Sequence, residues 1–296
     1  MINMNKERHK KLFALIAITL TVIFWGYSFV STKILLQDLP PISIAFFRQL
    51  IAAGALFIIL FCKKLFVRMA LKDVLLVFAS AFFGIVIYFL FENIGLKYTT
   101  ASNASIIVAA VPIFTLITES LFYKYKITAR IISCVILSIA GVFLVIFEKG
   151  LDFSSGYTLG NLLMIGAMVT WVIYTIICKS LTGRYNGIVI TAYQMMAASV
   201  LYIPLIIPEI NQWKGLSAYS MVNLLYLSLM CSALAYYLYN VAVKGLGATV
   251  SSMFLNLIPV VSILGGVLVL NEIVSFIQIG GMLLIMLSLI FVRGRT

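Results

Sequence analysis

Two ionisable side chains interrupt apolar stretches of this 296-residue chain and are its first candidates for chemistry. Arg48 lies in the stretch IAFFRQLIAA, and Glu92 lies in FLFENIGL. Charged side chains inside apolar helices are costly, and they usually mark a functional site in which they have a partner. Counted from Ile42 and Lys97, both charges lie ~7.5–9 Å from the same end of their helices, at ~1.5 Å per residue. Their similar depth predicts that they approach each other.

Arg48 and Glu92 can serve in different ways. They can form an ion pair that closes a gate, or they can bind a zwitterion, whose carboxylate would contact Arg48 and whose ammonium group would contact Glu92. Alternatively, both side chains can extend to the membrane surface without meeting, as charged residues near helix ends often do. If they pair, exchanging the two residues is expected to restore part of the folding that either single change removes.

Polar, small and aromatic side chains recur at spacings of three and four residues, which places them on one face of a helix. A proline inside such a stretch leaves the carbonyl four residues earlier without its helical hydrogen bond. Irregular backbone at membrane depth is tolerated where it lines a cavity, and aromatic rings can stack on a solute or act as gates. The alternative is close helix packing through small residues. The predicted cavity residues are Trp25, Ser28, Ser105, Pro112, Trp171, Tyr174, Tyr236, Asn240, Ser252, Asn256 and Pro259.

Several kinds of chemistry lack the residues that they need. The sequence contains no GxxxxGK[ST] phosphate-binding loop and no HExxH zinc motif. Its one histidine, His9, lies in a charged N-terminal segment, and its four cysteines lie far apart in or beside apolar stretches. Neither a histidine relay nor a metal cluster is therefore expected. We predict no cofactor, no metal and no enzymatic activity.

The elements that carry these residues are predicted to be membrane-spanning helices. The composition is 63% hydrophobic and only 10% charged, whereas soluble domains carry about 25% charged residues. A spanning helix needs ~20 mostly apolar residues, and ten runs meet or nearly meet this length. They cover 12–32, 39–62, 74–91, 98–118, 131–147, 153–178, 185–208, 215–243, 245–271 and 273–292. The predicted fold class is an all-α membrane protein with ten transmembrane helices.

The distribution of basic residues predicts how these helices are oriented. Lysines and arginines gather in the N-terminal segment, in every second connection and after the last run, whereas the other connections contain only Lys33, Lys97, Lys149 and Lys214. This positive-inside pattern predicts that both termini are cytoplasmic. The net charge of +12 is then a signal of topology, and we expect no nucleic-acid partner.

The two parts of the sequence, 1–149 and 150–296, resemble each other at a nearly constant offset. At an offset of 146 residues Trp25 matches Trp171, and at an offset of 147 Asn93, Lys97, Ser105 and Pro112 match Asn240, Lys244, Ser252 and Pro259. Arg48 and Glu92 fall on the neutral residues Gln194 and Tyr239. Each part contains five predicted helices, an odd number, so the second part enters the membrane from the opposite side. Such inverted repeats are typical of secondary transporters, whose substrate site lies near the midplane.

Four stretches support a resemblance over the whole chain. They are FWGYSF, AFFRQLIAA, NIGLKYTTASNASIIVAAVPIFT and LNLIPVVSILGGVLVLNE, and their order and spacing resemble those of the EamA-type ten-helix transporters of the drug/metabolite transporter superfamily. That family usually has an acidic residue about thirteen positions after the proline of each half. Glu272 fills this position in the second half, whereas Tyr125 stands there in the first. The connections that carry these two residues are therefore expected to be held differently.

The resemblance implies export or exchange of small metabolites, commonly amino acids, through a central cavity. We therefore predict a secondary, ATP-independent transporter of a small molecule, which works by alternating access in the cytoplasmic membrane of a bacterium. A flippase or exporter of amphipathic cationic drugs or lipid-linked solutes is the alternative within transport. A membrane sensor or scaffold without flux is the alternative outside it. The sequence leaves open the substrate, protons as the coupling ion, the direction of flux and the oligomeric state.

Overall fold

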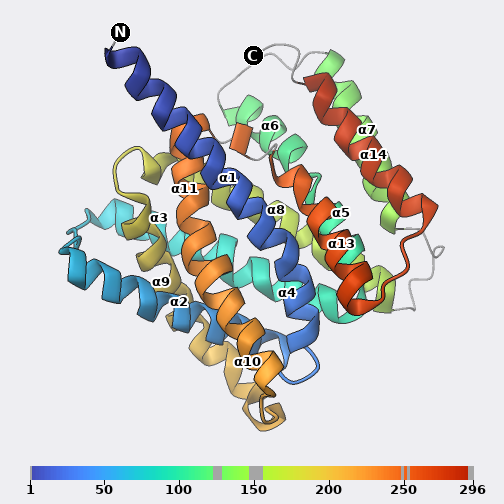
Figure 1. Cartoon of the computed structure of the whole chain (residues 1–296), viewed down its shortest axis with the longest axis horizontal. Helices are drawn as coiled ribbons and strands as arrows, with labels where there is room; N and C mark the ends of the chain where they lie inside the picture. Colours follow the sequence, from blue (N-terminus) through green and yellow to red (C-terminus); the bar gives the residue numbers. More distant parts are fainter. Residues whose placement is uncertain (1, 123–128, 147–155, 248–249, 252–253, 293–296) are drawn as a thin grey trace.

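The computed structural model describes residues 2–122, 129–146, 156–247, 250–251 and 254–292. Every regular element in these ranges is a helix (Figure 1), which confirms an all-helical fold. Six of the described helices are long and apolar enough to cross a membrane, and shorter apolar helices accompany them. The boundary predicted at 149/150 lies outside the described residues.

In the part of the chain before residue 147, the third long helix is a composite. Here α3, the π-helical segment η1 and α4 follow one another without a break. The bounds are α1 Ile2–Leu35, α2 Pro41–Lys63, α3 Leu71–Ala81, η1 Phe82–Ile87, α4 Tyr88–Tyr98, α5 Ala101–Val108, α6 Val111–Phe122 and α7 Ala129–Ile146.

The part of the chain after residue 155 has a similar composite helix, in which α10, the π-helical segment η3 and α11 are continuous. The short segments η2 and η4 are 3₁₀ turns. The bounds are α8 Gly156–Thr182, α9 Gly187–Ile206, η2 Ile207–Gln212, α10 Ala218–Leu225, η3 Tyr226–Leu234, α11 Ala235–Leu246, η4 Leu255–Leu257, α13 Ile258–Leu270 and α14 Phe276–Val292.

The prolines break their helices at the predicted places. The run 98–118 is divided, since α5 ends at Val108 and α6 begins at Val111, directly before Pro112. In the run 245–271, the 3₁₀ turn η4 directly precedes α13, which has Pro259 in its first turn. Proline lacks the N–H that would continue an α-helical hydrogen-bond ladder, so both helices change conformation just before it.

Two of the predicted helices, over 74–91 and 215–243, are not α-helical throughout, because each contains a π-helical segment. Hydrophobic periodicity does not reveal a π-helix, because one extra residue per turn leaves an apolar run apolar. Such segments are rare and are frequently found at functional sites. Here both lie in the middle of a membrane-length helix, and η1 begins at Phe82 and η3 at Tyr226.

Helices that are distant in sequence form the core of the bundle. α2 packs beside α9, α4 beside α8, and α1 beside both α11 and α13. α7 and α14 pair with each other at one edge of the molecule, seen at the right of Figure 1. Each of these neighbours joins an element before residue 147 to one after residue 155.

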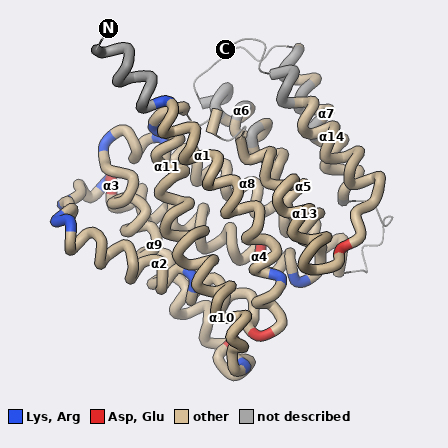
Figure 2. Tube along the Cα trace, in the orientation of Figure 1, with Lys and Arg blue, Asp and Glu red and all other residues tan. Residues whose placement is uncertain are grey.

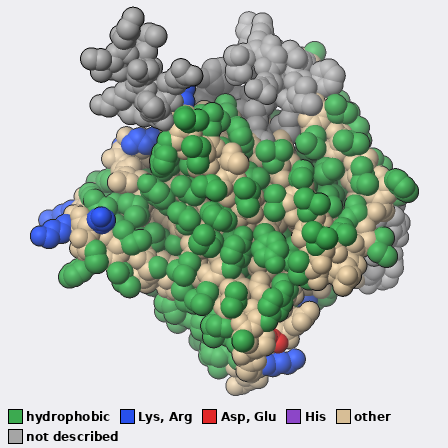
Figure 3. All heavy atoms as spheres, in the orientation of Figure 1, with side chains coloured by type: hydrophobic (Ala, Val, Ile, Leu, Met, Phe, Trp, Pro, Cys, Tyr) green, Lys and Arg blue, Asp and Glu red, His purple; other side chains and the backbone are tan. Residues whose placement is uncertain are grey.

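The surface of the bundle is apolar where a bilayer would cover it. Hydrophobic side chains cover most of the face seen in Figure 3. Well-exposed hydrophobic residues of the described part of the chain include Ile58, Phe61 and Leu268. Among the described residues, Lys and Arg lie mainly at helix ends and in connections (Figure 2). This distribution is that of an integral, multi-pass membrane protein.

The two ends of the bundle are named here by their charged residues. At the Glu209–Glu272 end, α1, α4, α9 and α13 finish, and α2 and α5 begin. Lys33 Nζ donates to the Leu96 carbonyl at 2.6 Å there and ties the last turn of α1 to α4. At the opposite Asp73–Arg184 end, α3 begins, α8 connects to α9, and α11 finishes.

Candidate functional site

A small cavity, called the central cavity here, is lined by residues of α1, α2, α4, α5, α8, α11, η4 and α13. Its volume is about 30 Å³, which is room for about two water molecules. The lining consists of aromatic and aliphatic side chains, one hydroxyl and two charged groups. The residues are Trp25, Ser28, Phe29, Arg48, Tyr88, Phe89, Glu92, Val108, Trp171, Tyr236, Leu255 and Ile258.

The structure brings about half of the predicted site residues together. Trp25, Ser28, Arg48, Glu92, Trp171 and Tyr236 line the cavity, and Tyr174 packs on Trp171 with ring centroids 4.7 Å apart.

The other predicted residues lie elsewhere. Ser105 donates to the Ser102 carbonyl within its own helix at 2.8 Å, Pro259 starts α13, and Asn240 lines a different cavity. Asn256 is buried in η4 next to the lining residue Leu255, but it does not itself line the cavity. Ser252 and the side chain of Pro112 lie outside the described residues.

The cavity wall is an aromatic cluster that joins four helices. Trp25 and Trp171, which the sequence offset matches, meet edge to face with centroids 5.1 Å apart. Tyr236 lies 5.4 Å from Trp25 and 5.7 Å from Trp171, and Tyr88 lies 5.3 Å from Trp171. These separations are those of favourable aromatic pairs. Both indoles are buried, as expected for tryptophans that lie too deep to belong to an interfacial belt.

Arg48 is held in the cavity by one hydrogen bond and one ring. Its Nε donates to Ser232 Oγ at 2.9 Å, and its guanidinium carbon lies 4.0 Å from the centroid of the Phe89 ring, a cation–π geometry. Only 1% of the residue is exposed. Its Nη1 atom has no hydrogen-bond partner among the residues that the structure describes, so part of a buried guanidinium is available to a solute.

Glu92 approaches the same cavity from α4. It is 2% exposed, and its Oε1 atom has no hydrogen-bond partner within the described part of the chain. Tyr88, one turn earlier on the same helix, also lines the cavity. Glu92 and Arg48 share the cavity without an ion pair of 4.0 Å or less between them, although the charge of Arg48 acts on the carboxyl group. Neither side chain extends to the membrane surface, which argues against the alternative in which both do so.

The π-helical segments supply carbonyl groups to the aromatic cluster. Trp25 Nε1 donates to the Cys231 carbonyl of η3 at 2.9 Å. In the matching segment η1, Tyr236 donates to the Gly84 carbonyl at 3.1 Å. Tyr202 donates to the Ile85 and Val86 carbonyls at 2.9 and 3.0 Å. A π-turn leaves carbonyls without their α-helical partners, and buried carbonyls need donors.

The two tryptophans therefore differ in their hydrogen bonding. The Gly84 carbonyl matches the Cys231 carbonyl by the offset of 147, but Tyr236 already uses it. Trp171 Nε1 has no partner among the described residues. With Arg48 Nη1 and Glu92 Oε1, it is one of three unpartnered polar atoms on residues that line one buried cavity. Such groups carry the full cost of desolvation unless something binds them.

Sequence reasoning missed several residues of the lining. Phe29, Tyr88, Phe89 and Ile258 line the cavity without having been predicted. Val108 and Leu255, which also line it, are the residues four positions before Pro112 and Pro259 whose carbonyls were expected to lose their helical partners. Phe89 could have been found, since it matches the predicted Tyr236 at an offset of 147. Ile258 carries no such signal, because an apolar residue in an apolar run does not show which way its side chain faces.

Two carboxylates close the Glu209–Glu272 end. Glu209 accepts from the Ile42 and Ser43 amides at 3.2 and 2.7 Å and from the Ser43 hydroxyl at 2.8 Å. Glu272 accepts from the Ala101 and Ser102 amides at 2.8 and 3.1 Å and from the Ser102 hydroxyl at 2.7 Å. The amides of a first helical turn have no partner within the helix and favour a negative charge. Each glutamate therefore fixes the start of a distant helix.

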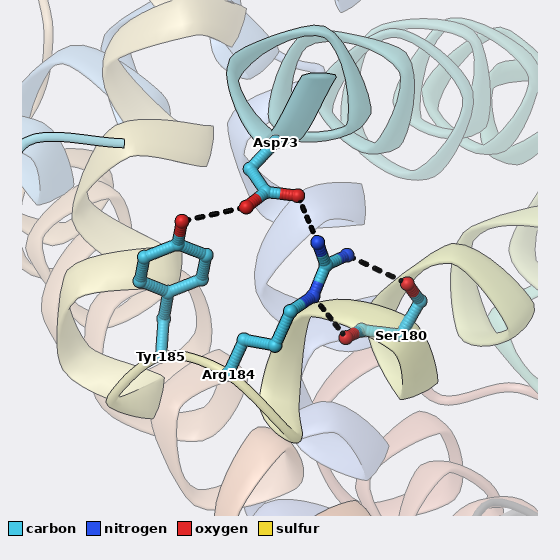
Figure 4. A network of polar contacts seen from close by, with 4 residues as sticks. All are labelled: Asp73, Ser180, Arg184 and Tyr185. Atoms are coloured by element: carbon cyan, nitrogen blue, oxygen red, sulfur yellow. Dashed lines mark hydrogen bonds and ion pairs between the residues drawn. The ribbon is translucent and has the colours of Figure 1, made fainter. Parts of the chain in front are cut away.

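A side-chain network holds the Asp73–Arg184 end (Figure 4). The Asp73 carboxylate pairs with the Arg184 guanidinium and accepts from the Tyr185 hydroxyl at 2.6 Å. The hydrogen bond to Asp73 raises the pKa of Tyr185. Arg184 also donates to the Ser180 carbonyl and hydroxyl at 3.2 and 2.9 Å. The network ties the start of α3 to the connection between α8 and α9.

The buried charges, the unpartnered polar atoms and the apolar exterior are features of a membrane protein that binds a polar solute in its core. The model of the EamA-like transporter family matches residues 12–147 and 158–294. The chain belongs to the EamA-like transporter family, which confirms the resemblance found in the sequence.

Relatives named as transporters cover nearly the whole chain. An uncharacterized transporter of Archaeoglobus fulgidus is 32% identical over 95% of this chain and 99% of its own. The uncharacterized transporter YcxC of Bacillus subtilis is 27% identical over 96% of this chain and 93% of its own. A protein of Streptantibioticus cattleyicolor named "Probable terminal-alkyne amino-acid exporter" is 24% identical over 95% and 93%.

A solved crystal structure shares the fold. It superposes with a TM-score of 0.68 over 95% of this chain and 96% of its own, at 16% sequence identity. This likeness concerns the fold alone.

Proposed function

We propose that the protein is a secondary transporter that exports small zwitterionic metabolites, amino acids foremost, by alternating access across a bacterial cytoplasmic membrane. The observation that carries the proposal is the central cavity, where Arg48 and Glu92 are buried without forming an ion pair and each keeps an unpartnered polar atom. A carboxylate at Arg48 and an ammonium group at Glu92 would satisfy both. The Trp171 N–H would be a further donor to the carboxylate.

The aromatic walls favour a solute with an apolar side chain. Trp25, Trp171 and Tyr236 offer ring faces and edges and leave little room. Even a small amino acid exceeds the space for two water molecules, so binding requires the bundle to open around the cavity. A related protein named as an amino-acid exporter supports the same class of substrate.

We also propose that the chain forms ten transmembrane helices as two inverted repeats, residues 1–149 and 150–296, with both termini cytoplasmic. The contact between Trp25 and Trp171, the π-helical segments at matching positions and the pairing of α7 with α14 support this arrangement. The positive-inside pattern then makes the Glu209–Glu272 end extracellular and the Asp73–Arg184 end cytoplasmic.

Solute counterflow in proteoliposomes tests the proposal. Vesicles loaded with a mixture of unlabelled amino acids are offered trace labelled ones, with wild type beside Glu92→Gln. Asp38→Asn, which removes a carboxylate outside the cavity, is the matched control. We expect transient accumulation in wild type and Asp38→Asn and its loss in Glu92→Gln. Equal accumulation in Glu92→Gln would leave a carrier but remove Glu92 from its cycle.

Absence of accumulation for every amino acid would overturn the proposed substrate class. Labelled tetraphenylphosphonium would then test export of amphipathic cations, which the aromatic walls and the Glu92 carboxylate could also accommodate. Counterflow at several pH values, with and without a proton gradient, would separate exchange from proton coupling. A protein that binds solute without any flux would be a sensor or scaffold.

Exchange of the two charges tests whether Arg48 and Glu92 act together. We expect each of Arg48→Glu and Glu92→Arg to destabilise the protein, because each leaves two like charges in one cavity. The double exchange should recover part of the loss if the charges interact. Thermal unfolding in detergent measures this, and additive losses would show that the two side chains act independently.

A further inference from the structure

A second cavity opens at the Asp73–Arg184 end and shares no residue with the central one. Its volume is about 330 Å³, roughly ten times that of the central cavity. The last residues of α8, the connection to α9, the start of α9 and the end of α11 form its wall. The lining residues are Thr182, Arg184, Tyr185, Asn186, Gly187, Asn240, Val241 and Lys244.

The lining of this cavity is basic. Lys244 stands in the last turn of α11, is exposed, and makes no ion pair or hydrogen bond with the part of the chain that the structure describes. Arg184 adds a second cation, which is shared with Asp73. The start of α9, a helix of 20 residues, contributes the partial positive charge of a helix N-terminus. An anionic group is therefore favoured here.

Asn240 contributes a buried acceptor oxygen that a ligand with an N–H or O–H group could satisfy. The residue is 1% exposed and donates through Nδ2 to Thr191 Oγ1 at 3.0 Å. Its Oδ1 atom has no partner among the described residues, yet the residue lines the cavity. A ligand with a donor close to its anionic group would satisfy this oxygen and Lys244 together. The ammonium and carboxylate groups of an amino acid have this arrangement.

At the opposite end of the molecule, the position that corresponds to this cavity is the start of α2, and a carboxylate of the chain binds there. The offset of 146 matches the start of α9 to the start of α2, and the offset of 147 matches Asn240 to Asn93. At the start of α2, the Glu209 carboxylate binds the Ser43 amide, and Asn93 donates to the Pro41 carbonyl at 2.9 Å.

The start of α9 lacks such a carboxylate. Lys63 stands at the position that matches Glu209, and Asn186 accepts from the Ile188 amide instead. The chain fills one of the two related places with its own carboxylate, whereas the other is bordered by Lys244 and by Arg184, which is paired with Asp73.

We infer that this cavity is a vestibule that binds the carboxylate and the adjacent N–H group of the solute before it passes to the central cavity. The inference rests on the proposed function, because it assigns the vestibule to the solute that is exported. Lys244 would attract the carboxylate, and Asn240 Oδ1 would accept from the neighbouring N–H. A solute that loses its carboxylate would no longer be held here.

Protection of Lys244 from acylation tests the site without any transport measurement. The protein is reconstituted in phosphatidylcholine vesicles, and an amine-reactive acylating reagent is added with or without N-acetylglycine, which has a carboxylate and a neighbouring N–H but no reactive amine. N-acetylglycinamide, which lacks the charge, is the control probe. Lys97, the exposed counterpart of Lys244 at the other end, is the control residue. Peptide mass spectrometry gives the acylation rate at each lysine.

We expect N-acetylglycine to slow acylation of Lys244 about threefold or more, and to leave Lys97 unchanged. The amide should protect neither residue. Equal rates with and without N-acetylglycine would overturn the inference. Anionic phosphatidylglycerol added to the vesicles separates the two sources of an anion. If this lipid protects Lys244 while N-acetylglycine does not, the cavity holds a lipid headgroup and the inference is wrong.

Transport kinetics then connect the site to export. Lys244→Gln should raise the KM for efflux from the Asp73–Arg184 face about threefold or more with little change in kcat, whereas Lys97→Gln should change neither. Lys244→Arg, which keeps the charge, should stay near wild type. An unchanged KM in an active Lys244→Gln protein would exclude a vestibule on the transport route. Failure of wild type in counterflow would overturn the proposed function, and protection of Lys244 would then still establish an anion site.

Discussion

The two ends of the helix bundle are both held by charged side chains, but these side chains bind different groups. At the Glu209–Glu272 end, each carboxylate binds two backbone amides and a serine hydroxyl at a helix start. At the Asp73–Arg184 end, the ion pair joins two side chains, and 42% of the Arg184 side chain is exposed. The cavity of about 330 Å³ lies at this second end.

The two ends of the bundle should therefore differ in how easily their helices separate. A carboxylate that leaves a helix start exposes two amides without partners, so separation costs several hydrogen bonds to a charged group. At the other end Asp73 is buried, but the Arg184 side chain is 42% exposed, so its guanidinium can exchange the carboxylate for water at a lower cost. The Asp73–Arg184 end should therefore open more readily, which fits a protein whose solute is taken up from that side.

The largest loss of stability is expected from Glu272→Gln and Glu209→Gln, at the end that is held by carboxylates. Each variant keeps the size of the side chain but removes the charge that strengthens three hydrogen bonds, which are worth ~1.5–3 kcal/mol each when one partner is charged. Because the amide keeps one acceptor, we expect a loss of about 2 kcal/mol per site. Thermal unfolding in detergent measures it.

Ser102→Ala and Ser43→Ala are the matched controls for the two glutamates. Each removes one hydroxyl from the carboxylate and leaves both amide contacts, so for Ser102→Ala the loss should be about half as large. Ser43→Ala should lose more, because the Ser43 hydroxyl also accepts from Trp213 Nε1 at 2.7 Å. A glutamine variant as stable as wild type would show that the carboxylates do not hold the helix starts.

A smaller effect is expected from Arg184→Met at the opposite end. The partly exposed pair with Asp73 should contribute about 0–1 kcal/mol, and the difference from wild type should shrink in 0.5 M NaCl because salt screens exposed charges. Unfolding in low and high salt measures this. A loss equal to that of Glu272→Gln, unaffected by salt, would mean that the two ends are held equally firmly.

The smallest effect concerns Asp38, between α1 and α2. Ser220 Oγ donates to its carboxylate and lowers the pKa of Asp38 below its usual value of 3.8. A lowered pKa stabilises the folded protein while the group is ionised, and this contribution is lost as the pH falls through the folded-state pKa. Ser220→Ala should thus lower the unfolding temperature by about 1–2 °C at pH 7.

The difference between Ser220→Ala and wild type should disappear once the pH falls below the folded-state pKa of Asp38, because the carboxyl group is then protonated in both proteins. Unfolding temperatures across this pH range provide the measurement. A difference that persists at low pH would assign the effect to the packing of Ser220.

The sequence alone predicted the helical class and the similar depth of the two charges, and about half of the predicted cavity residues line the central cavity. Apolar runs of membrane length can form little besides helices, and an offset of 146 residues matched Trp25 to Trp171 before any contact was known. Counting residues from the helix ends gave Arg48 and Glu92 similar depths, and both line one cavity. The periodicity of a helix and the distance of a residue from the helix end depend only on nearby residues, so both can be predicted from the sequence.

Only the tertiary structure decided which groups bind each other. Arg48 and Glu92 share a cavity without pairing, and Ser232 and Phe89 hold the guanidinium instead. Glu209 binds the start of α2 through Ser43, which is 166 residues away, and nothing in the sequence indicated this contact. Glu272 is the acidic residue noted in the sequence, but its partner Ser102 was not predictable; Tyr125, its counterpart, lies outside the described residues. Hydrogen bonds and packing across the bundle depend on which helices become neighbours, and helix periodicity fixes the face of a helix without fixing its neighbour.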